Sequence, residues 1–292
     1  IGQGTYSSVY RARDLTHNKI VALKTSSSWR EIIVMRRLDH PNVLKLEGLI
    51  TAPVSSSLYL VFDYMDHDLL GLSSLPGVEF TEPQVKCYMR QLLSGLEHCH
   101  SRGVLHRDIK GSNLLIDGNG VLKIADFGLA TFFDPKAKTV ALTSHVVTLW
   151  YRPPELLLGA SHYGVGVDLW STGCILGELY AGKPILPGKT EVEQLHKIFK
   201  LCGSPTESYW RKHNLPSSAG FRTAIPYRRN VLLLLETLLS IDPDHRSSAS
   251  SALESEYFKT KPLACDPSCL PKYPPSKEID AKLRDDEEKA TT

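Results

Sequence analysis

The sequence lacks several features that mark whole classes of protein. The strongly apolar run at residues 231–235 ends at Glu236, far short of the roughly 18 residues that a membrane-spanning helix needs. The formal net charge is only +2, from 34 Lys and Arg against 32 Asp and Glu, so nothing points to a nucleic-acid or membrane partner. There is no signal peptide and no initiator methionine. We therefore expect that an N-terminal region and its targeting signals are missing.

Cysteine is also sparse and unpatterned. The six cysteines include no C-x-x-C pair, which is typical of reduced thiols in a nuclear or cytoplasmic protein rather than of a disulfide framework. His98, Cys99 and His100 are adjacent, but alternate residues of a helix point in different directions and no second ligand cluster follows. The sequence therefore gives no reason to expect a structural metal site.

The hydrophobic pattern changes character near residue 63. Strand-like runs at 9–12, 20–23 and 58–62 enclose one helical segment at 29–38. Amphipathic helices are then expected at 84–100, 166–181, 192–201, 231–239 and 248–255, with Thr81 and Gln84 forming a capping box for the first. The pattern predicts an α+β protein with a small β-rich lobe over 1–63, a hinge at 63–68, a larger helical lobe over 69–258, and a polar, partly disordered tail over 259–292.

Two features of the β-rich lobe are ambiguous by themselves. Glycines in the segment 2–9 would let the backbone approach phosphate oxygens closely, but a glycine-bearing hairpin turn has a similar sequence. Lys24 ends a strand-like run and could neutralise phosphate charge as a buried cation, or could simply lie in solvent.

The segment 106–113, HRDIKGSN, is more specific. Asp108 can accept a hydroxyl proton, Asn113 can bind Mg²⁺ and Lys110 between them can steady a terminal phosphate. Asp126 follows in a DFG triplet after a predicted strand over 121–125, and a PPE triplet occurs at 153–155. The ordered set is the signature of phosphoryl transfer from ATP.

With these motifs in this order, the chain resembles a eukaryotic protein kinase of the cyclin-dependent class, most of all the plant-type, transcription-associated members, over residues 1–258. The resemblance implies a bilobal protein kinase fold, with a small antiparallel β-rich N-lobe and a larger helical C-lobe. It also implies ATP and Mg²⁺ as cofactors, and Lys110 is the serine/threonine version of its motif rather than the tyrosine version.

The resemblance assigns roles position by position. The catalytic residues are Asp108, Lys110 and Lys24, and the residues that bind the metal are Asn113 and Asp126. The ATP-binding residues are Ile1, Gly2, Gly4, Val9, Ala22, Lys24, Phe62, Asp63, Met65 and Leu115. The regulatory residues are Glu31, Thr5, Tyr6, Thr143, Arg107 and Arg30. The substrate pocket, which favours proline after the target residue, contains Val146, Val147 and Arg152.

Several of these positions have a purely structural alternative. Thr143 could be one more loop hydroxyl rather than an activating phosphorylation site. Glu155 and Arg246 are expected to form a buried structural ion pair. Asp168 is expected to bond the backbone of the catalytic loop rather than to take part in chemistry.

The chain departs from the family pattern between Lys24 and Glu31, where only six residues remain and most of the cyclin-binding helix is missing. Glu31 then has two interpretations. It could pair with Lys24, since seven residue steps reach about 24 Å, or it could form a capping box with Ser28. A second gap lies between Arg229 and Glu236, and Thr131 replaces an arginine expected to grip the activating phosphate.

Two hypotheses follow. The first is an active, proline-directed serine/threonine kinase that acts on Ser/Thr-Pro sites of protein substrates, with the RNA polymerase II C-terminal domain as a candidate. The second is an ATP-binding pseudokinase or scaffold in which Lys24 is unpaired and Glu31 faces solvent. A cyclin is the partner that the family implies, but we expect its binding to be weakened or lost here, and we expect no direct nucleic-acid partner. The expected location is nuclear, cytoplasmic or both.

Overall fold

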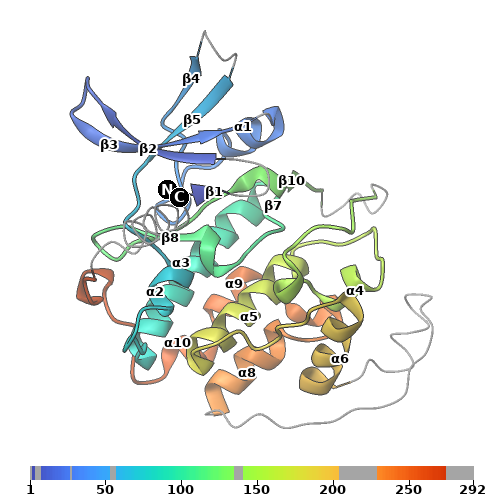
Figure 1. Cartoon of the computed structure of the whole chain (residues 1–292). Coiled ribbons are helices and arrows are strands. Elements are labelled where there is room, and N and C mark those ends of the chain that lie inside the picture. The colour runs from blue at the N-terminus through green and yellow to red at the C-terminus, as the bar shows by residue number, and fades with distance from the viewer. Residues whose placement is uncertain are drawn as a thin grey trace, which may run out of the picture.

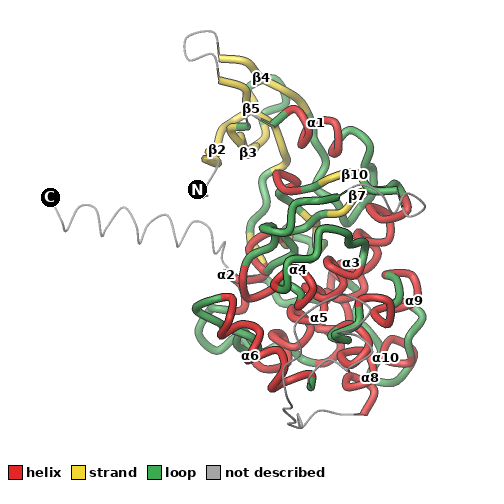
Figure 2. The backbone as a smooth tube through the Cα atoms, turned by 90° about the vertical axis from the view of Figure 1, so that its right-hand side faces the viewer, coloured by secondary structure: helices red, strands yellow, loops and turns green. Residues whose placement is uncertain are grey.

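The computed structural model describes residues 2–3, 8–26, 28–52, 57–134, 141–203 and 229–273. Figure 1 shows two lobes stacked on each other, with the strands of the first 63 residues in one and most of the helices in the other. The same division is plain in the view turned by 90° (Figure 2). The predicted fold, a small antiparallel β lobe and a larger helical lobe, is confirmed.

The smaller lobe contains one antiparallel sheet with the strand order β1-β2-β3-β5-β4. Its strands are β1 (Gly2–Gln3), β2 (Ser8–Asp14), β3 (Lys19–Thr25), β4 (Gly48–Ala52) and β5 (Ser57–Asp63). The helix α1 (Trp29–Met35) connects to the sheet through β3 and buries the side chains of Ile32 and Val34. It ends three residues earlier than the pattern indicates, because Arg36 and Arg37 continue only as a turn.

The larger lobe consists of helices and two small sheets. The helices are α2 (Leu69–Ser73), α3 (Glu82–Ser101), α4 (Pro154–Leu157), α5 (Gly166–Ala181), α6 (Glu191–Cys202), α8 (Arg229–Leu238), α9 (Ala249–Leu253) and α10 (Glu256–Lys259). One sheet has the order β6-β8-β9, from His67–Asp68, Leu114–Ile116 and Leu122–Ile124. The other pairs β7 (Val104–Leu105) with β10 (Thr131–Phe132).

The two longest helices form the core of this lobe. At the start of α3 the backbone N–H of Thr81 donates to Gln84 Oε1 at 2.8 Å, as the capping-box pattern predicts. The helix α5 is buried over nearly its whole length. It can approach the end of α8 closely because Gly173 has no side chain, since a Cβ there would lie 2.8 Å from the side chain of Leu239.

The first part of the predicted tail packs against the larger lobe. The ammonium group of Lys86, on α3, is fully buried and donates to the carbonyl oxygens of Thr260 and Pro262, both at 2.8 Å. The backbone N–H of Cys265 donates to the carbonyl of Pro83 at 3.1 Å. Ordered structure therefore continues beyond residue 258 to at least residue 273, whereas the rest of the tail lies outside the described residues.

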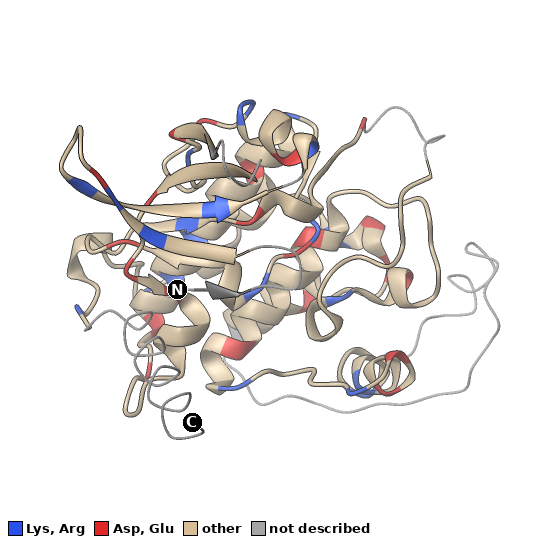
Figure 3. Cartoon of the chain, turned by 45° about the horizontal axis from the view of Figure 1, so that its top comes forward, with Lys and Arg blue, Asp and Glu red and all other residues tan. Residues whose placement is uncertain are grey.

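Two general properties concern the described part as a whole. None of its helices is both long enough and apolar enough to cross a membrane. Figure 3 shows basic and acidic residues interspersed over both lobes, consistent with the small formal net charge.

Candidate functional site

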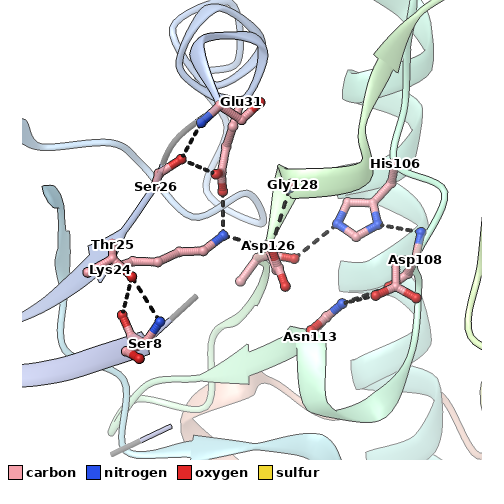
Figure 4. A network of polar contacts seen from close by, with 12 residues as sticks. Ser8, Lys24, Thr25, Ser26, Glu31, His106, Asp108, Asn113, Asp126 and Gly128 are labelled. Atoms are coloured by element: carbon pink, nitrogen blue, oxygen red, sulfur yellow. Dashed lines mark hydrogen bonds and ion pairs between the residues drawn. The ribbon is translucent and has the colours of Figure 1, made fainter. Parts of the chain in front are cut away.

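Lys24 lies at the centre of a polar network where the lobes meet (Figure 4). Its Nζ atom is 2.5 Å from Glu31 Oε1 and 2.7 Å from Asp126 Oδ1, and the residue is only 8% exposed. Burial alone would lower the pKa of the Lys24 ammonium, but the carboxylates of Asp126 and Glu31 raise it above its ordinary value. Lys24 is therefore a buried cation and not a solvated lysine at the end of a strand.

Glu31 bonds Lys24 and does not cap the helix. It is 3% exposed, and its second carboxylate oxygen accepts a hydrogen bond from Ser26 Oγ at 3.0 Å. Ser28 occupies the N-cap position, but among the described residues its side chain makes no capping hydrogen bond. The capping-box interpretation of Ser28 and Glu31 is therefore wrong, because Glu31 turns toward the sheet, where a buried ammonium and a hydroxyl satisfy both of its oxygens.

Asp126 lies in a strained turn, two residues after the end of β9. Its backbone is left-handed (φ 63°), and its carboxylate accepts a hydrogen bond from the backbone N–H of Gly128 at 3.3 Å. Partial burial favours the neutral form, but the Lys24 ammonium holds the pKa of Asp126 below its ordinary value. The side chain is 45% exposed, so an ionised carboxylate beside Lys24 also faces solvent. Such an oxygen can bind a metal ion.

Asp108 is enclosed by hydrogen-bond donors. Its Oδ1 accepts from the hydroxyl and the backbone N–H of Thr148, at 2.8 and 3.1 Å. Its Oδ2 lies 2.8 Å from Lys110 Nζ and 3.1 Å from Asn113 Nδ2. The structure therefore brings together Asp108, Lys110 and Asn113, as predicted. Sequence reasoning assigned no contact to Thr148, and its separation of 40 positions from Asp108 gave no signal for one.

His106 joins the catalytic loop to the Asp126 turn. Its Nδ1 accepts from the backbone N–H of Asp108 at 3.2 Å, so the proton is on Nε2, which donates to the carbonyl of Ala125 at 3.0 Å. The edge of its ring packs on Phe127, with centroids 4.9 Å apart. The relative position of Asp108 and Asp126 is thus fixed through one buried ring.

Asp168, on α5, accepts hydrogen bonds from the backbone of the same loop. Its carboxylate accepts from the backbone N–H groups of His106 and Arg107, at 3.0 and 2.8 Å, and from His100 Nε2 at 2.9 Å. Burial would raise the pKa of Asp168, but these hydrogen bonds hold it below its ordinary value. The predicted structural role is confirmed. His100 is therefore part of this support, and the described residues contain no cluster of three or more His, Cys, Asp or Glu side chains placed to hold a metal ion.

The predicted substrate pocket has an unusual backbone. Val147 is left-handed (φ 68°), which is costly for a β-branched residue. Arg152 Nε donates to the carbonyl of Val147 at 3.1 Å, and Arg152 Nη1 also pairs with Glu191 Oε1 at 2.6 Å. Val146 and Val147 are both buried. The Val147 carbonyl is therefore already occupied by a side chain of this protein.

The regulatory positions are only partly connected. Arg107 donates to the hydroxyl of Tyr163 at 2.9 Å, and that hydroxyl donates to the carbonyl of Thr143 at 2.6 Å. Thr143 is exposed, and its phosphorylation stays a prediction. Arg30 is exposed on α1, and Thr131, which replaces an expected arginine, is buried in β10.

The predicted ATP-binding residues lie on neighbouring strands and the hinge. Val9 is opposite Lys24 and also opposite Gly2, while Ala22 is opposite Phe62. Asp63 ends β5, Met65 is buried in the hinge, and Leu115 lies on β8. The other predicted ATP-binding residues outside the described part of the chain are Ile1 and Gly4, and the predicted regulatory residues Thr5 and Tyr6 lie outside it as well.

The predicted structural ion pair is present in the larger lobe. Arg246 contacts both carboxylate oxygens of Glu155, at 2.6 and 2.7 Å, and neither side chain is appreciably exposed. The guanidinium also lies over the ring of Trp170, 4.9 Å from its centroid. Glu155 and Arg246 therefore connect α4 to the segment before α9.

Known proteins are similar to this chain in sequence and in fold. The family model described as "Protein kinase domain" matches residues 1–258. A probable serine/threonine-protein kinase of Arabidopsis thaliana is 63% identical over 309 aligned positions, which cover 98% of this chain and 54% of that protein. Cyclin-dependent kinase C-1 of the same plant is 48% identical, with 97% of this chain and 63% of that protein covered. The chain spans about half the length of the curated relatives it matches.

Solved structures are similar over almost the whole chain. The yeast RNA Pol II CTD kinase CTDK-1 complex contains a chain that is 38% identical, with a TM-score of 0.81 and 90% of this chain and 92% of that chain covered. The CAK complex of Chaetomium thermophilum bound to ATP-gamma-S contains one that is 32% identical, with a TM-score of 0.83 and 94% and 93% covered. The chain belongs to the protein kinase family.

Proposed function

We propose that this chain transfers the terminal phosphoryl group of ATP to serine or threonine hydroxyls of protein substrates. The observation that carries the proposal is the pair of contacts that Lys24 makes with Glu31 and Asp126. Those contacts hold a buried cation beside an ionised carboxylate, while the enclosed Asp108 lies on the neighbouring loop. Placing these groups is most of what a protein contributes to phosphoryl transfer.

Each residue has a distinct task. Asp108 accepts the proton of the attacking hydroxyl, and Lys110, bonded to it at 2.8 Å, is placed to steady the negative charge on the transferred group. Lys24 balances the charge of the other phosphates. Every member of the set is present with its expected side chain.

The residues present suit a magnesium ion. The carboxylate of Asp126 faces solvent, and Asn113 directs its amide NH₂ at Asp108, so its carbonyl oxygen is turned away from that carboxylate. Carboxylate and amide oxygens are the ligands that Mg²⁺ prefers, and Asp126 and Asn113 would hold it. When bound, the ion would neutralise charge that develops on the phosphate oxygens.

The pseudokinase alternative required Glu31 to face solvent, away from Lys24. Glu31 is instead buried and bonded to Lys24 Nζ at 2.5 Å. The shortened connection between β3 and α1 has not separated the pair. The active-kinase hypothesis is therefore favoured.

We extend the proposal to substrate choice. Because the Val147 carbonyl is bonded to Arg152, a substrate residue placed there would find no acceptor for its backbone N–H. Proline has no N–H to satisfy. Sites of the type Ser-Pro or Thr-Pro are thus favoured, and the similar kinase described as an RNA Pol II CTD kinase supports Ser-Pro-rich repeats of that polymerase as a substrate, which would require a nuclear location.

The test is incorporation of labelled phosphate from ATP into a Ser-Pro peptide. We expect transfer by the natural sequence and loss of transfer in Asp126→Ala, which removes a metal-binding oxygen and leaves Lys24 with one carboxylate. A thermal shift of the variant should show that it is still folded. Equal labelling by Asp126→Ala would contradict the proposal.

A further inference from the structure

Ser26 occupies a junction between the sheet and α1. Its backbone N–H donates to the carbonyl of Leu58 at 3.1 Å, which continues the β3–β5 pairing by one residue. Its hydroxyl donates to Glu31 Oε2 at 3.0 Å and accepts from the backbone N–H of Ser28 at 3.2 Å. Figure 4 shows Ser26 between the strand and the helix, with its oxygen directed at the Glu31 carboxylate.

The strand end that presents Ser26 is fixed on both sides. Thr25 Oγ1 accepts from the backbone N–H of Ser8 at 2.9 Å, and Thr25 is opposite Tyr59 in the sheet. Because β3 is an inner strand between β2 and β5, its end cannot shift without breaking ladder hydrogen bonds. Ser26 is therefore a fixed donor and not a residue of a free loop.

Glu31 is held between two donors, one on β3 and one directly after its last residue. One carboxylate oxygen contacts Lys24 Nζ and the other contacts Ser26 Oγ. Only residues 27 and 28 separate Ser26 from the first residue of α1, and Glu31 lies in the first turn of that helix. A rotation of α1 that took Glu31 away from Lys24 would leave a buried carboxylate without either donor, which is costly.

We propose that Ser26 is a positioning residue that holds Glu31 against Lys24 from within the chain, so that formation of this pair does not depend on a second protein. The connection between β3 and α1, which is shorter than the family pattern, thus acts as a clamp. The clamp consists of Ser26, its hydrogen bond to Glu31 and the hydrogen bond that it accepts from Ser28. The kinetic consequence rests on the proposed kinase activity, but the clamp also has a consequence for nucleotide binding, because Lys24 is the residue proposed to balance phosphate charge.

The chain offers a matched control two positions away, at Ser28. Ser28 contributes only its backbone N–H to the clamp, so Ser28→Ala keeps every hydrogen bond described above. Ser26→Ala removes the donor, and Ser26→Thr keeps a hydroxyl at the same place. In the isolated chain, with Mg²⁺ present, we would measure the affinity for a fluorescent ADP analogue and, separately, kcat and KM on a Ser-Pro peptide.

We expect Ser26→Ala to weaken nucleotide binding or kcat/KM about tenfold, the size of one hydrogen bond to a charged group. Ser26→Thr should restore most of the loss, and Ser28→Ala should match the natural sequence. If Ser26 acts through Glu31, then Ser26→Ala should cost nothing further in a Glu31→Gln background. A purely structural role would instead give equal costs in both backgrounds.

Three results would overturn the inference: an unchanged Ser26→Ala variant, an equal loss in Ser28→Ala, or additive losses of Ser26→Ala and Glu31→Gln. Failure of the proposed function would give a different experimental result. In that case the natural sequence transfers no phosphate, yet the single and double variants can still be compared by nucleotide affinity. Urea unfolding of each variant separates loss of the clamp from loss of the fold.

Discussion

The carboxylates of Asp126 and Asp108 belong to the same site but lie in different surroundings. Asp126 contacts an ammonium and remains partly open to solvent. Asp108 is almost fully buried, and the described contacts of its carboxylate are with donors of Thr148, Lys110 and Asn113. An exposed ionised oxygen suits a metal ion, whereas an enclosed and oriented one suits proton transfer from a positioned hydroxyl.

The occupied carbonyl of Val147 gives a prediction about substrates. Replacing proline by alanine after the target serine adds a backbone N–H that finds no acceptor, which costs about 1–3 kcal/mol and lowers kcat/KM by roughly tenfold or more. The measurement is steady-state phosphorylation of paired peptides. A proline-to-alanine change before the serine serves as the control and should have little effect. Equal kcat/KM values for the Ser-Pro and Ser-Ala peptides would refute the pocket assignment.

Asp168 gives a prediction about pH. Its pKa in the folded protein lies below its ordinary value, so its contribution to stability is fully present above pH ~4 and is lost as pH falls through the lower, folded-state pKa. Asp168→Asn lacks this titration. Urea unfolding should therefore show the variant to be less stable at pH 6, with a difference that shrinks as the pH falls toward 3. A difference that stays constant over this range would contradict the stated role of Asp168.

At the level of elements, helices with a clear amphipathic or apolar period were predictable from local sequence. The bounds of α5 match the expectation, and Thr81 and Gln84 mark the start of α3 as their spacing indicates. Local sequence failed at α1. Ser28 and Glu31 have the spacing of a capping box, and only the sheet, which places Lys24 and Ser26 beside Glu31, decides against it.

The role of Ser26 could not be predicted from sequence for the same reason. One serine among several in a short connection has no pattern, and its position depends on the pairing of residues 26 and 58. The packing of residues 259–273 against the larger lobe could not be predicted from the sequence either. Proline-rich, polar sequence indicates an extended segment, and it is the buried Lys86 on α3 that supplies donors for the carbonyls of Thr260 and Pro262.

The ion pair between Glu155 and Arg246 gives a prediction about how elements are joined. Arg246→Met removes one partner and leaves Glu155 buried and uncompensated, which should cost about 3–5 kcal/mol of unfolding free energy. Lys259→Met removes an exposed pair with Glu254 (3.2 Å) and should cost less than ~1 kcal/mol. Urea unfolding measures both. Similar losses for the two variants would show that the buried pair is not structural.

For the molecule as a whole, the shortened α1 leads to a prediction about the binding of other proteins. The helix has seven residues, and the large apolar side chains it exposes are Trp29 and Ile33. The helical turns that the family pattern places before Trp29 are absent. If a complex with a cyclin buries three large apolar side chains fewer as a result, it loses about 5 kcal/mol of binding free energy, which is more than a thousandfold in affinity. The site itself does not require those turns, because Glu31 is already bonded to Lys24.

We therefore predict that cyclins of the transcriptional type bind this chain with micromolar affinity or more weakly. Isothermal titration calorimetry against a panel of cyclins is the measurement. Trp29→Ala should remove any residual binding, since it deletes the largest exposed apolar side chain of α1. Submicromolar binding to any cyclin of the panel, or residual binding that survives Trp29→Ala, would show that another surface is used.

In the proposed function, this site transfers phosphate with Asp108 as the group that takes the hydroxyl proton. The most direct test compares the natural sequence with Asp108→Asn, which has nearly the same shape but cannot accept that proton, in single-turnover phosphorylation of a Ser-Pro peptide. We predict transfer by the natural sequence, and a loss of about 10²–10⁴-fold in rate for the variant with unchanged nucleotide affinity. Nucleotide binding without transfer by the natural sequence, or equal rates for both proteins, would contradict the claim.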